Sequence, residues 1–205
     1  LSVEVADRYL ASEIDYIRVS GYARFYRPIW GPFIFRLNAE SGLVFSRRAE
    51  GVPIYERYFL GGIQSIRGYR LYSLGPRIQI QSALEPGSYL TQFSVGANWQ
   101  LILNSEIEFM IIPAVQIKGV VFFDMGNGYN LEAKYCTSAT ATSALPEVFN
   151  PCVHYPTFQN LRYSVGFGFR WFSPIGPLRF EWGIPLNPQP GEDPLVFEFT
   201  IGNFF

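Results

Sequence analysis

Apolar and polar residues alternate along most of this chain. Between Tyr16 and Tyr26, every second position is apolar or small, and the positions between them carry tyrosine, arginine or serine. Because residues two apart lie on the same face of a β-strand, this segment is predicted to be a strand with one apolar and one polar face. Helical periodicity is not sustained in any segment. The pattern therefore predicts an all-β protein.

The same alternation recurs in segments that lie far apart in the sequence. We predict eight strands, at residues 1–5, 16–26, 33–40, 100–109, 115–124, 162–171, 178–183 and 197–201. Short turns at residues 28–32, 111–113 and 173–177 alternate with longer links at residues 7–15, 45–98, 125–160 and 185–194. Short turns at one end and long loops at the other are typical of a transmembrane antiparallel β-barrel of the bacterial outer membrane. A soluble β-sandwich or lipocalin-like barrel is the alternative, because its strands alternate too.

Composition favours the membrane barrel. Charged residues make up only 16% of the chain and aromatic residues 18%, whereas soluble domains carry roughly 25% charged residues. In a membrane barrel the apolar face points to lipid and the polar face to the lumen, and every backbone group must be paired across strands. The net charge of −1, without a run of lysines or arginines, provides no field for nucleic acid. Nucleic acid is therefore not expected as a partner.

Other membrane and export signals are missing from the sequence. The longest apolar runs, such as Phe109–Val115, are far shorter than the roughly 18 residues of a membrane-spanning helix. The first residues lack the features of a secretory signal, so an exported chain is expected to be a mature fragment. Cys136 and Cys152 lie in one polar stretch, which fits either a disulfide in an external loop or two free thiols. Export favours the disulfide.

Three motifs carry a family resemblance. Residues 55–69 read YERYFLGGIQSIRGY, residues 122–129 read FFDMGNGY, and residues 197–205 read FEFTIGNFF. These motifs and their order resemble the BamA superfamily of outer-membrane proteins, in which a long loop presents an Arg-Gly-aromatic tip. The resemblance covers essentially the whole chain. It implies that residues 1–205 are the C-terminal part of an outer-membrane barrel domain, the last eight of sixteen strands, with a loop at about 46–98 that folds into the lumen.

The resemblance also implies how this loop is held. The expected loop anchor motif consists of Gly61, Gly62, Arg67, Gly68 and Tyr69. Its glycines permit backbone conformations and close approaches that side chains block. Its arginine is a permanently charged fork that needs carboxylates inside a barrel.

The lumen face of the predicted strands offers such carboxylates. The resemblance implies that Arg67 contacts Asp124 and Glu108, with Glu106 on the same face and Phe122 packed beside the loop tip. A paired-carboxylate active site is the alternative for these acids, but no nucleophile or metal-ligand cluster accompanies them. The only histidine, His154, lies in a polar loop beside Cys152 and is expected to be solvated. We therefore expect no enzyme activity, no cofactor and no metal.

The end of the chain has its own pattern. Phe197, Phe199, Ile201 and Phe205 share one parity, so they are predicted to line the lipid side of the last strand. This pattern resembles the C-terminal signal that the assembly machinery reads, although Asn203 interrupts it. Residues 1–5 and 197–205 are predicted to be unpaired sheet edges, and such edges seek each other or another chain. We therefore expect closure as an eight-stranded barrel or a homodimer.

The resemblance implies insertion of β-barrel proteins into the outer membrane without covalent chemistry, through a thinned bilayer and a templating strand edge. The expected partners are the lipid bilayer, unfolded outer-membrane protein clients and, through periplasmic domains absent from this segment, assembly lipoproteins. A two-partner secretion or TamA-like polypeptide translocation channel is the first alternative, because it shares the Arg-Gly-aromatic loop. A small passive porin or adhesion barrel is the second, and it predicts no inward loop.

Overall fold

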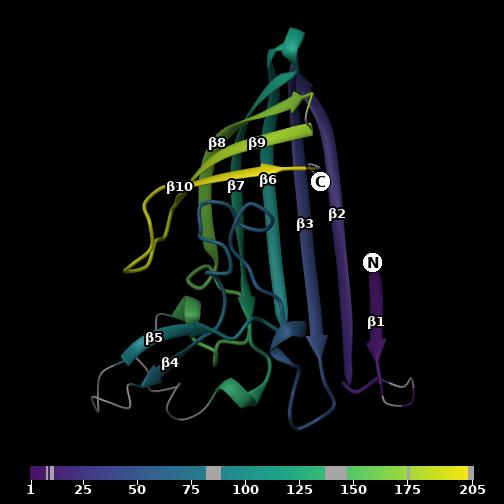
Figure 1. Ribbon diagram of the computed structural model, residues 1–205, viewed down its shortest axis with the longest axis vertical. Coiled ribbons are helices and arrows are strands. Elements are labelled where there is room, and N and C mark those ends of the chain that lie inside the picture. The colour runs from purple at the N-terminus through teal and green to yellow at the C-terminus, as the bar shows by residue number, and fades with distance from the viewer. Residues whose placement is uncertain (8, 10–11, 82–88, 137–146, 175, 203–205) are drawn as a thin grey trace.

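The computed structural model describes residues 1–7, 9, 12–81, 89–136, 147–174 and 176–202 (Figure 1). An antiparallel sheet of eight strands dominates it, in the order β1 (Ser2–Ala6), β2 (Tyr16–Trp30), β3 (Phe33–Phe45), β6 (Trp99–Ile112), β7 (Ile117–Tyr129), β8 (Arg162–Ser173), β9 (Gly176–Pro185) and β10 (Val196–Ile201). A separate hairpin consists of β4 (Arg77–Gln81) and β5 (Tyr89–Ser94). The short 3₁₀ helices are η2 (Ile54–Glu56), η3 (Pro113–Val115), η4 (Ala133–Tyr135) and η5 (Glu147–Phe149). Within the described ranges, no helix is both long and apolar enough to cross a membrane.

All eight predicted strands are present, and most are longer than predicted. The first predicted turn shows why. β2 continues through Pro28 to Trp30, with a register shift between these two residues, which is where a strand tolerates proline. The turn then narrows to Gly31 and Pro32, and the positive φ of 53° at Gly31 suits so short a connection. The β4–β5 hairpin was not predicted, because it lies within the link that was assigned as one long loop.

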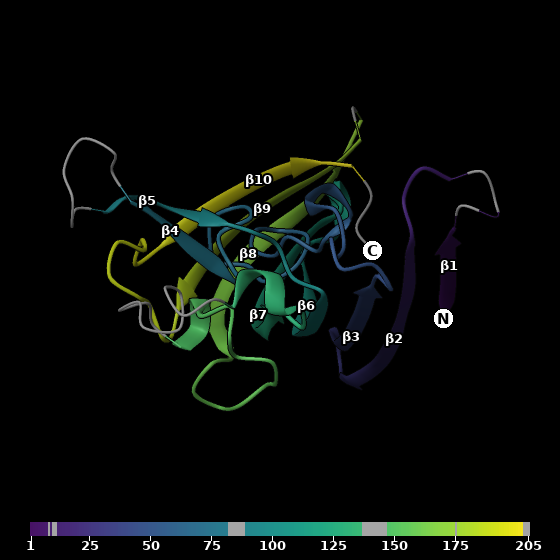
Figure 2. The same ribbon diagram turned by 90° about the horizontal axis from the view of Figure 1, so that it is seen from below.

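The sheet is curled but not closed. Figure 2 shows its strands as an arc, with the chain between β3 and β6 on the concave side. β1 and β10 stand at opposite ends of the strand order, so among the described residues each pairs with one neighbour only. The expected eight-stranded closure is therefore wrong. Eight strands enclose an interior just wide enough for side chains, whereas this concave side holds a segment of the chain itself. Pairing with a second copy stays a prediction.

The outer face of the sheet is apolar and aromatic. Phe197, Phe199 and Ile201 of β10 are about half-exposed on it, as predicted, while Phe205 lies outside the described residues. Pairing of β8, β9 and β10 aligns Phe167, Trp182 and Phe197 in one row. Their rings are separated by 5.6 Å and 5.0 Å, distances at which cross-strand aromatic pairs stabilise a sheet.

The concave face is polar, and much of it is buried. Asn104, Glu106 and Glu108 of β6 point to this side and are at most 7% exposed. Ionised groups in such a position need partners, because an unpaired buried charge is very unfavourable. The sheet therefore has polar residues inside and apolar residues outside, which is the arrangement predicted for an outer-membrane barrel.

Candidate functional site: a loop anchored on the concave face

The chain between β3 and β6 folds back against the sheet. Residues Leu60, Ile66, Tyr69 and Leu74 of this segment are at most 2% exposed and form an apolar cluster with Ala97 and Ile102. The backbone N–H of Leu74 donates to the carbonyl of Leu60 at 3.0 Å, which joins the two arms of the segment. We call residues 61–70, which lie between the two arms, the loop tip. The predicted loop anchor motif lies entirely within it.

Arg67 of the loop tip is fully surrounded by the sheet. Its Nε and Nη2 atoms both donate to the Asp124 carboxylate at 2.7 Å, and its backbone N–H donates to the same carboxylate at 3.1 Å. Nη1 donates to Glu106 at 3.1 Å and to Glu181 at 3.2 Å. The guanidinium lies over the Phe122 ring, 3.7 Å from its centroid, so a cation–π contact closes the remaining side. Burial alone would lower the pKa of Arg67, but the three carboxylates outweigh it and raise that pKa.

Glu108 does not have the partner that the sequence suggested. Its carboxylate accepts hydrogen bonds from Lys118 at 2.7 Å, Arg36 at 2.9 Å and Arg170 at 3.2 Å. The strand register explains the difference: Asp124 lies opposite Asn104, and Glu108 is four residues further along β6, or roughly 13 Å at the usual rise per residue. The expected contact between Arg67 and Glu108 is therefore wrong, and Glu106 and Glu181 take that place.

Three arginines and three carboxylates share this buried region. Arg170 of β8 donates to the Glu106 carboxylate through Nη1 at 2.8 Å and Nη2 at 2.7 Å. Arg179 of β9 donates to the Glu181 carboxylate through Nε at 2.7 Å and Nη2 at 2.9 Å. We call this set the lumen charge cluster; it consists of Arg67, Arg170, Arg179, Glu106, Asp124 and Glu181. Its formal charges cancel, which is the condition under which buried ions are tolerated. Removing one member leaves its partners buried and unpaired.

Glycines allow the loop tip to approach the sheet. Gly68 has a φ of +82°, and a Cβ on it would lie 3.0 Å from the carbonyl carbon of Gly183 in β9. Gly61 and Gly62 also have positive φ values, of 106° and 94°, a region that L residues with side chains rarely occupy. Backbone therefore packs on backbone where the loop tip meets β9.

Tyr69 fixes the other side of the loop tip. Its hydroxyl lies 2.6 Å from the carbonyl oxygen of Tyr163 and 2.9 Å from Oδ1 of Asn187. Arg162 of β8 lies 4.7 Å from the centroid of the Tyr69 ring and forms an ion pair with Glu192. The aromatic residue of the Arg-Gly-aromatic motif thus binds β8 and the connection between β9 and β10.

A second buried arginine holds the base of the loop. Arg57 donates to Asn98 and Asn130 at 2.7 Å and to Glu132 at 3.0 Å. Its guanidinium also lies 4.7 Å from the centroid of the Tyr135 ring. The loop between β3 and β6 is therefore tied to the chain that follows β7.

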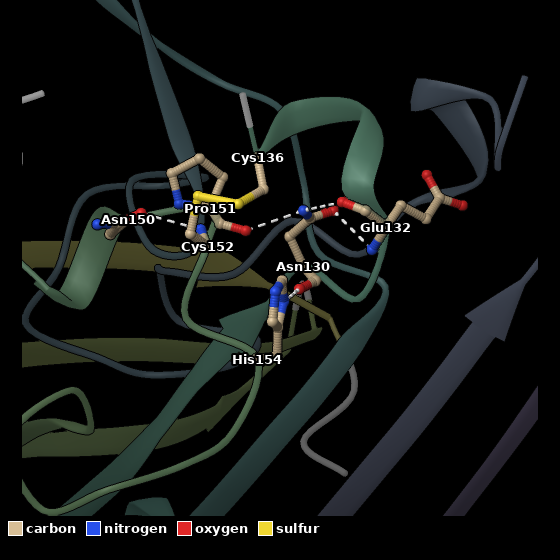
Figure 3. The surroundings of a disulfide bond; sticks show 7 residues. All are labelled: Asn130, Glu132, Cys136, Asn150, Pro151, Cys152 and His154. Carbon is tan, nitrogen blue, oxygen red and sulfur yellow. Dashed lines mark hydrogen bonds between the residues drawn. A yellow bond between two sulfur atoms is a disulfide. The ribbon is translucent and has the colours of Figure 1, made fainter. Parts of the chain in front are cut away.

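That following chain contains the disulfide, which joins Cys136 to Cys152 (Figure 3). Asn130 donates to the carbonyl of Pro151 at 2.9 Å, and its own carbonyl contacts the ring of His154. His154 keeps this contact and is exposed, as expected for a solvated loop histidine. Asn130 therefore joins Arg57 of the loop to the disulfide-bonded chain between β7 and β8.

The family follows from a comparison with family models. The model of the Omp85 superfamily domain matches residues 1–205, which is the whole chain. The chain belongs to the Omp85 superfamily. This Omp85 chain is 27% identical over 201 residues to the outer membrane protein assembly factor BamA of Neisseria meningitidis serogroup B, covering 95% of this chain and 24% of that protein. It is 28% identical over 198 residues to the protein of the same name from Nitratidesulfovibrio vulgaris, covering 96% and 21%.

A solved structure supports the fold of this Omp85 chain. The crystal structure of BamA from Haemophilus ducreyi lacking POTRA domains 1–3 superimposes with a TM-score of 0.73 at 23% identity, over 90% of this chain and 34% of that one. At this identity the likeness concerns the fold, an outer-membrane β-barrel. The chain spans about a quarter of the length of the curated relatives that it matches.

The ion pairs of this Omp85 site hold the loop tip against the sheet. Arg67 joins the loop tip to β6, β7 and β9 through Glu106, Asp124 and Glu181. Among the described residues, no group of three or more His, Cys, Asp or Glu side chains is placed to hold a metal ion.

Four contributors were not anticipated as site residues. Glu181, Arg170 and Arg179 share the parity of the lumen face on their strands, so the alternation already placed them inside. The alternation does not give their position along the strands relative to Arg67, because that position depends on the register of β8 and β9. Arg57 lies within the motif at residues 55–69, but nothing in the local sequence predicts its partners beyond residue 95.

Proposed function

We propose that this chain is part of an outer-membrane β-barrel that folds and inserts other outer-membrane proteins, in the bacterial outer membrane and without covalent catalysis. The observation that carries the proposal is the buried anchor of Arg67 on Asp124, together with similarity to proteins named outer membrane protein assembly factor. A loop locked inside the lumen is incompatible with a simple open pore. It suits a barrel whose working parts are its wall and its strand edges.

The proposed partners follow from the two faces of the sheet. The aromatic outer face would contact the lipid bilayer, and unfolded outer-membrane proteins would be the clients. Assembly lipoproteins would bind through periplasmic domains, and a homodimer through the open sheet edges is a further proposal. Neither enzymatic activity nor a cofactor is part of this function, because the buried carboxylates already have arginine partners.

Reconstitution tests the proposal. The protein is placed in liposomes, and the folding rate of an urea-unfolded β-barrel client is followed by its heat-modifiable migration on gels. We expect faster client folding than in protein-free liposomes, and loss of most of this acceleration in Arg67→Ala. Arg70→Ala is the matched control, because Arg70 is an exposed arginine three residues away that pairs with Asp193. Equal client folding with and without the protein would refute the proposal.

The same liposomes separate the alternatives. A passive porin would conduct ions in the unaltered protein and would not accelerate client folding. A polypeptide translocation channel would deliver a soluble secreted client to the vesicle interior without inserting it. The buried loop favours assembly or translocation over the passive pore.

A further inference from the structure

The last strand of the sheet also contacts the loop tip. Glu198 of β10 points to the concave side, whereas its neighbours Phe197 and Phe199 are exposed on the outer face. The Glu198 carboxylate lies against the loop tip, beside Gly62 and close to the backbone N–H groups of Ile63 and Gly68. One side chain of β10 therefore contacts the loop tip.

The loop tip is shaped to receive this carboxylate. The N–H of Ser65 donates to the carbonyl of Gly62 at 3.0 Å, and the N–H of Gly62 donates to the carbonyl of Ile66 at 3.2 Å, which makes a tight turn. A Cβ on Gly62 would lie 3.3 Å from Oε1 of Glu198. The missing side chain at Gly62 thus leaves room for the carboxylate beside the turn.

Glu198 faces a second carboxylate across the β9–β10 pair. In the pairing of β9 with β10, Glu198 lies directly opposite Glu181, and like charges opposite each other destabilise a strand pair. While the loop tip is docked, Arg67 binds Glu181, and the backbone of the loop tip at Gly62 lies against the Glu198 carboxylate. When the loop tip leaves, Glu181 loses one of its arginines and Glu198 loses this contact at the same time.

We propose that Glu198 is a positioning residue through which the docked loop tip holds the terminal strand β10 in place. Arg67 fixes the loop tip to β7, and Glu198 passes that constraint to β10. β10 has six paired residues and, among the described strands, β9 as its one neighbour. Undocking of the loop tip therefore loosens the strand that forms this edge of the sheet. The inference rests on the proposed function, because a controlled strand edge is what an assembly factor would offer to a client.

Two distances in one molecule test the proposal. The sequence has two cysteines and these form the disulfide, so spin labels attach only to introduced cysteines in protein purified from membranes into detergent. One pair, Leu71→Cys with Ile201→Cys, reports the distance from the loop to β10. The other pair, Leu71→Cys with Val121→Cys, reports the distance from the loop to β7. All three positions are exposed, and pulsed electron paramagnetic resonance gives both distance distributions.

In Glu198→Ala we expect the loop–β10 distribution to broaden and the loop–β7 distribution to stay narrow, because Arg67 and Asp124 are intact. Glu198→Gln should keep both distributions narrow, since glutamine preserves the size and polarity of the side chain beside Gly62 and carries no charge opposite Glu181. Thr200→Ala, on the same face of β10, is the matched control and should resemble the unaltered protein. An unchanged loop–β10 distribution in Glu198→Ala, or equal broadening of both distributions, would overturn the proposal.

Hydrogen exchange provides a second test if Glu198→Ala does not fold. In Arg67→Ala we expect the β10 amides to exchange roughly tenfold faster, as after loss of hydrogen bonds to a charged group, and the β2 amides to keep their rates. Equal rates in β10 before and after the change would count against the coupling. Neither experiment uses a client, so failure of the coupling and failure of client folding are distinguishable.

Discussion

Gly183 of β9 lies directly against Gly68 of the loop tip: a Cβ on Gly183 would be 2.4 Å from both the Cα and the N atom of Gly68. Atoms do not approach this closely without displacement, because protein interiors are already close-packed. The contact therefore requires glycine in the sheet as well as in the loop. It separates steric docking of the loop tip from its electrostatic anchoring.

Replacing Gly183 by alanine should lift the loop tip from β9. We expect a cost of about 1–3 kcal/mol, as for overpacking of a dense interior, seen as faster proteolysis within the loop while the barrel keeps its heat-modifiable migration. Gly21→Ala is the matched control, because a Cβ there has its nearest neighbour at an ordinary 3.6 Å. Equal protease resistance of the two variants would show that the loop tip has room to adjust.

The anchoring carboxylates should differ in importance. Glu181→Gln weakens a direct ion pair of Arg67, whereas Glu108→Gln alters a group bound by Arg36, Lys118 and Arg170. We expect the loop to open roughly tenfold more often in Glu181→Gln, since a hydrogen bond to a charged group contributes about 1.5–3 kcal/mol. Proteolysis rates measure this opening. More frequent opening in Glu108→Gln than in Glu181→Gln would reverse our assignment of partners.

The disulfide should stabilise the chain between β7 and β8 and leave the sheet unaffected. Joining Cys136 to Cys152 closes a ring with a sequence separation of 16, and such a ring contributes roughly 3 kcal/mol. In the double change Cys136→Ser with Cys152→Ser we expect faster hydrogen exchange around Asn130, with unchanged exchange in β7 and β8. Two free thiols in unreduced protein, found by mass spectrometry, would contradict the pairing.

Strand positions and faces were predictable from the sequence because they depend on local alternation. The apolar parity of Phe197, Phe199 and Ile201 places them outside, and the opposite parity on β6 places Glu106 inside. Strand ends were less predictable, as at Pro28, because pairing with a neighbour extends a strand beyond its local signal. The β4–β5 hairpin was missed although its residues alternate, since a long loop had been assigned to that whole region.

Contacts across the lumen depend on register and were only partly predictable. Asp124 as the partner of Arg67 came from the family resemblance, and the structure places the two groups together. Glu108 came from the same resemblance, and Glu181 was not anticipated, because nothing in a strand's own sequence gives its position relative to another strand. A shift of a few residues along β6 is enough to exchange one carboxylate for another.

A double-mutant cycle of Arg67→Ala and Asp124→Ala, read by proteolysis of the loop in detergent, tests the anchoring of the loop most directly. The two side chains are at most 1% exposed, and breaking such a pair costs about 3–5 kcal/mol because the survivor stays buried. We expect each single change to open the loop and the double change to cost clearly less than the sum, with Arg67→Lys intermediate because it lacks the planar fork. Strictly additive effects would contradict the anchor, since they would mean that Arg67 and Asp124 act independently.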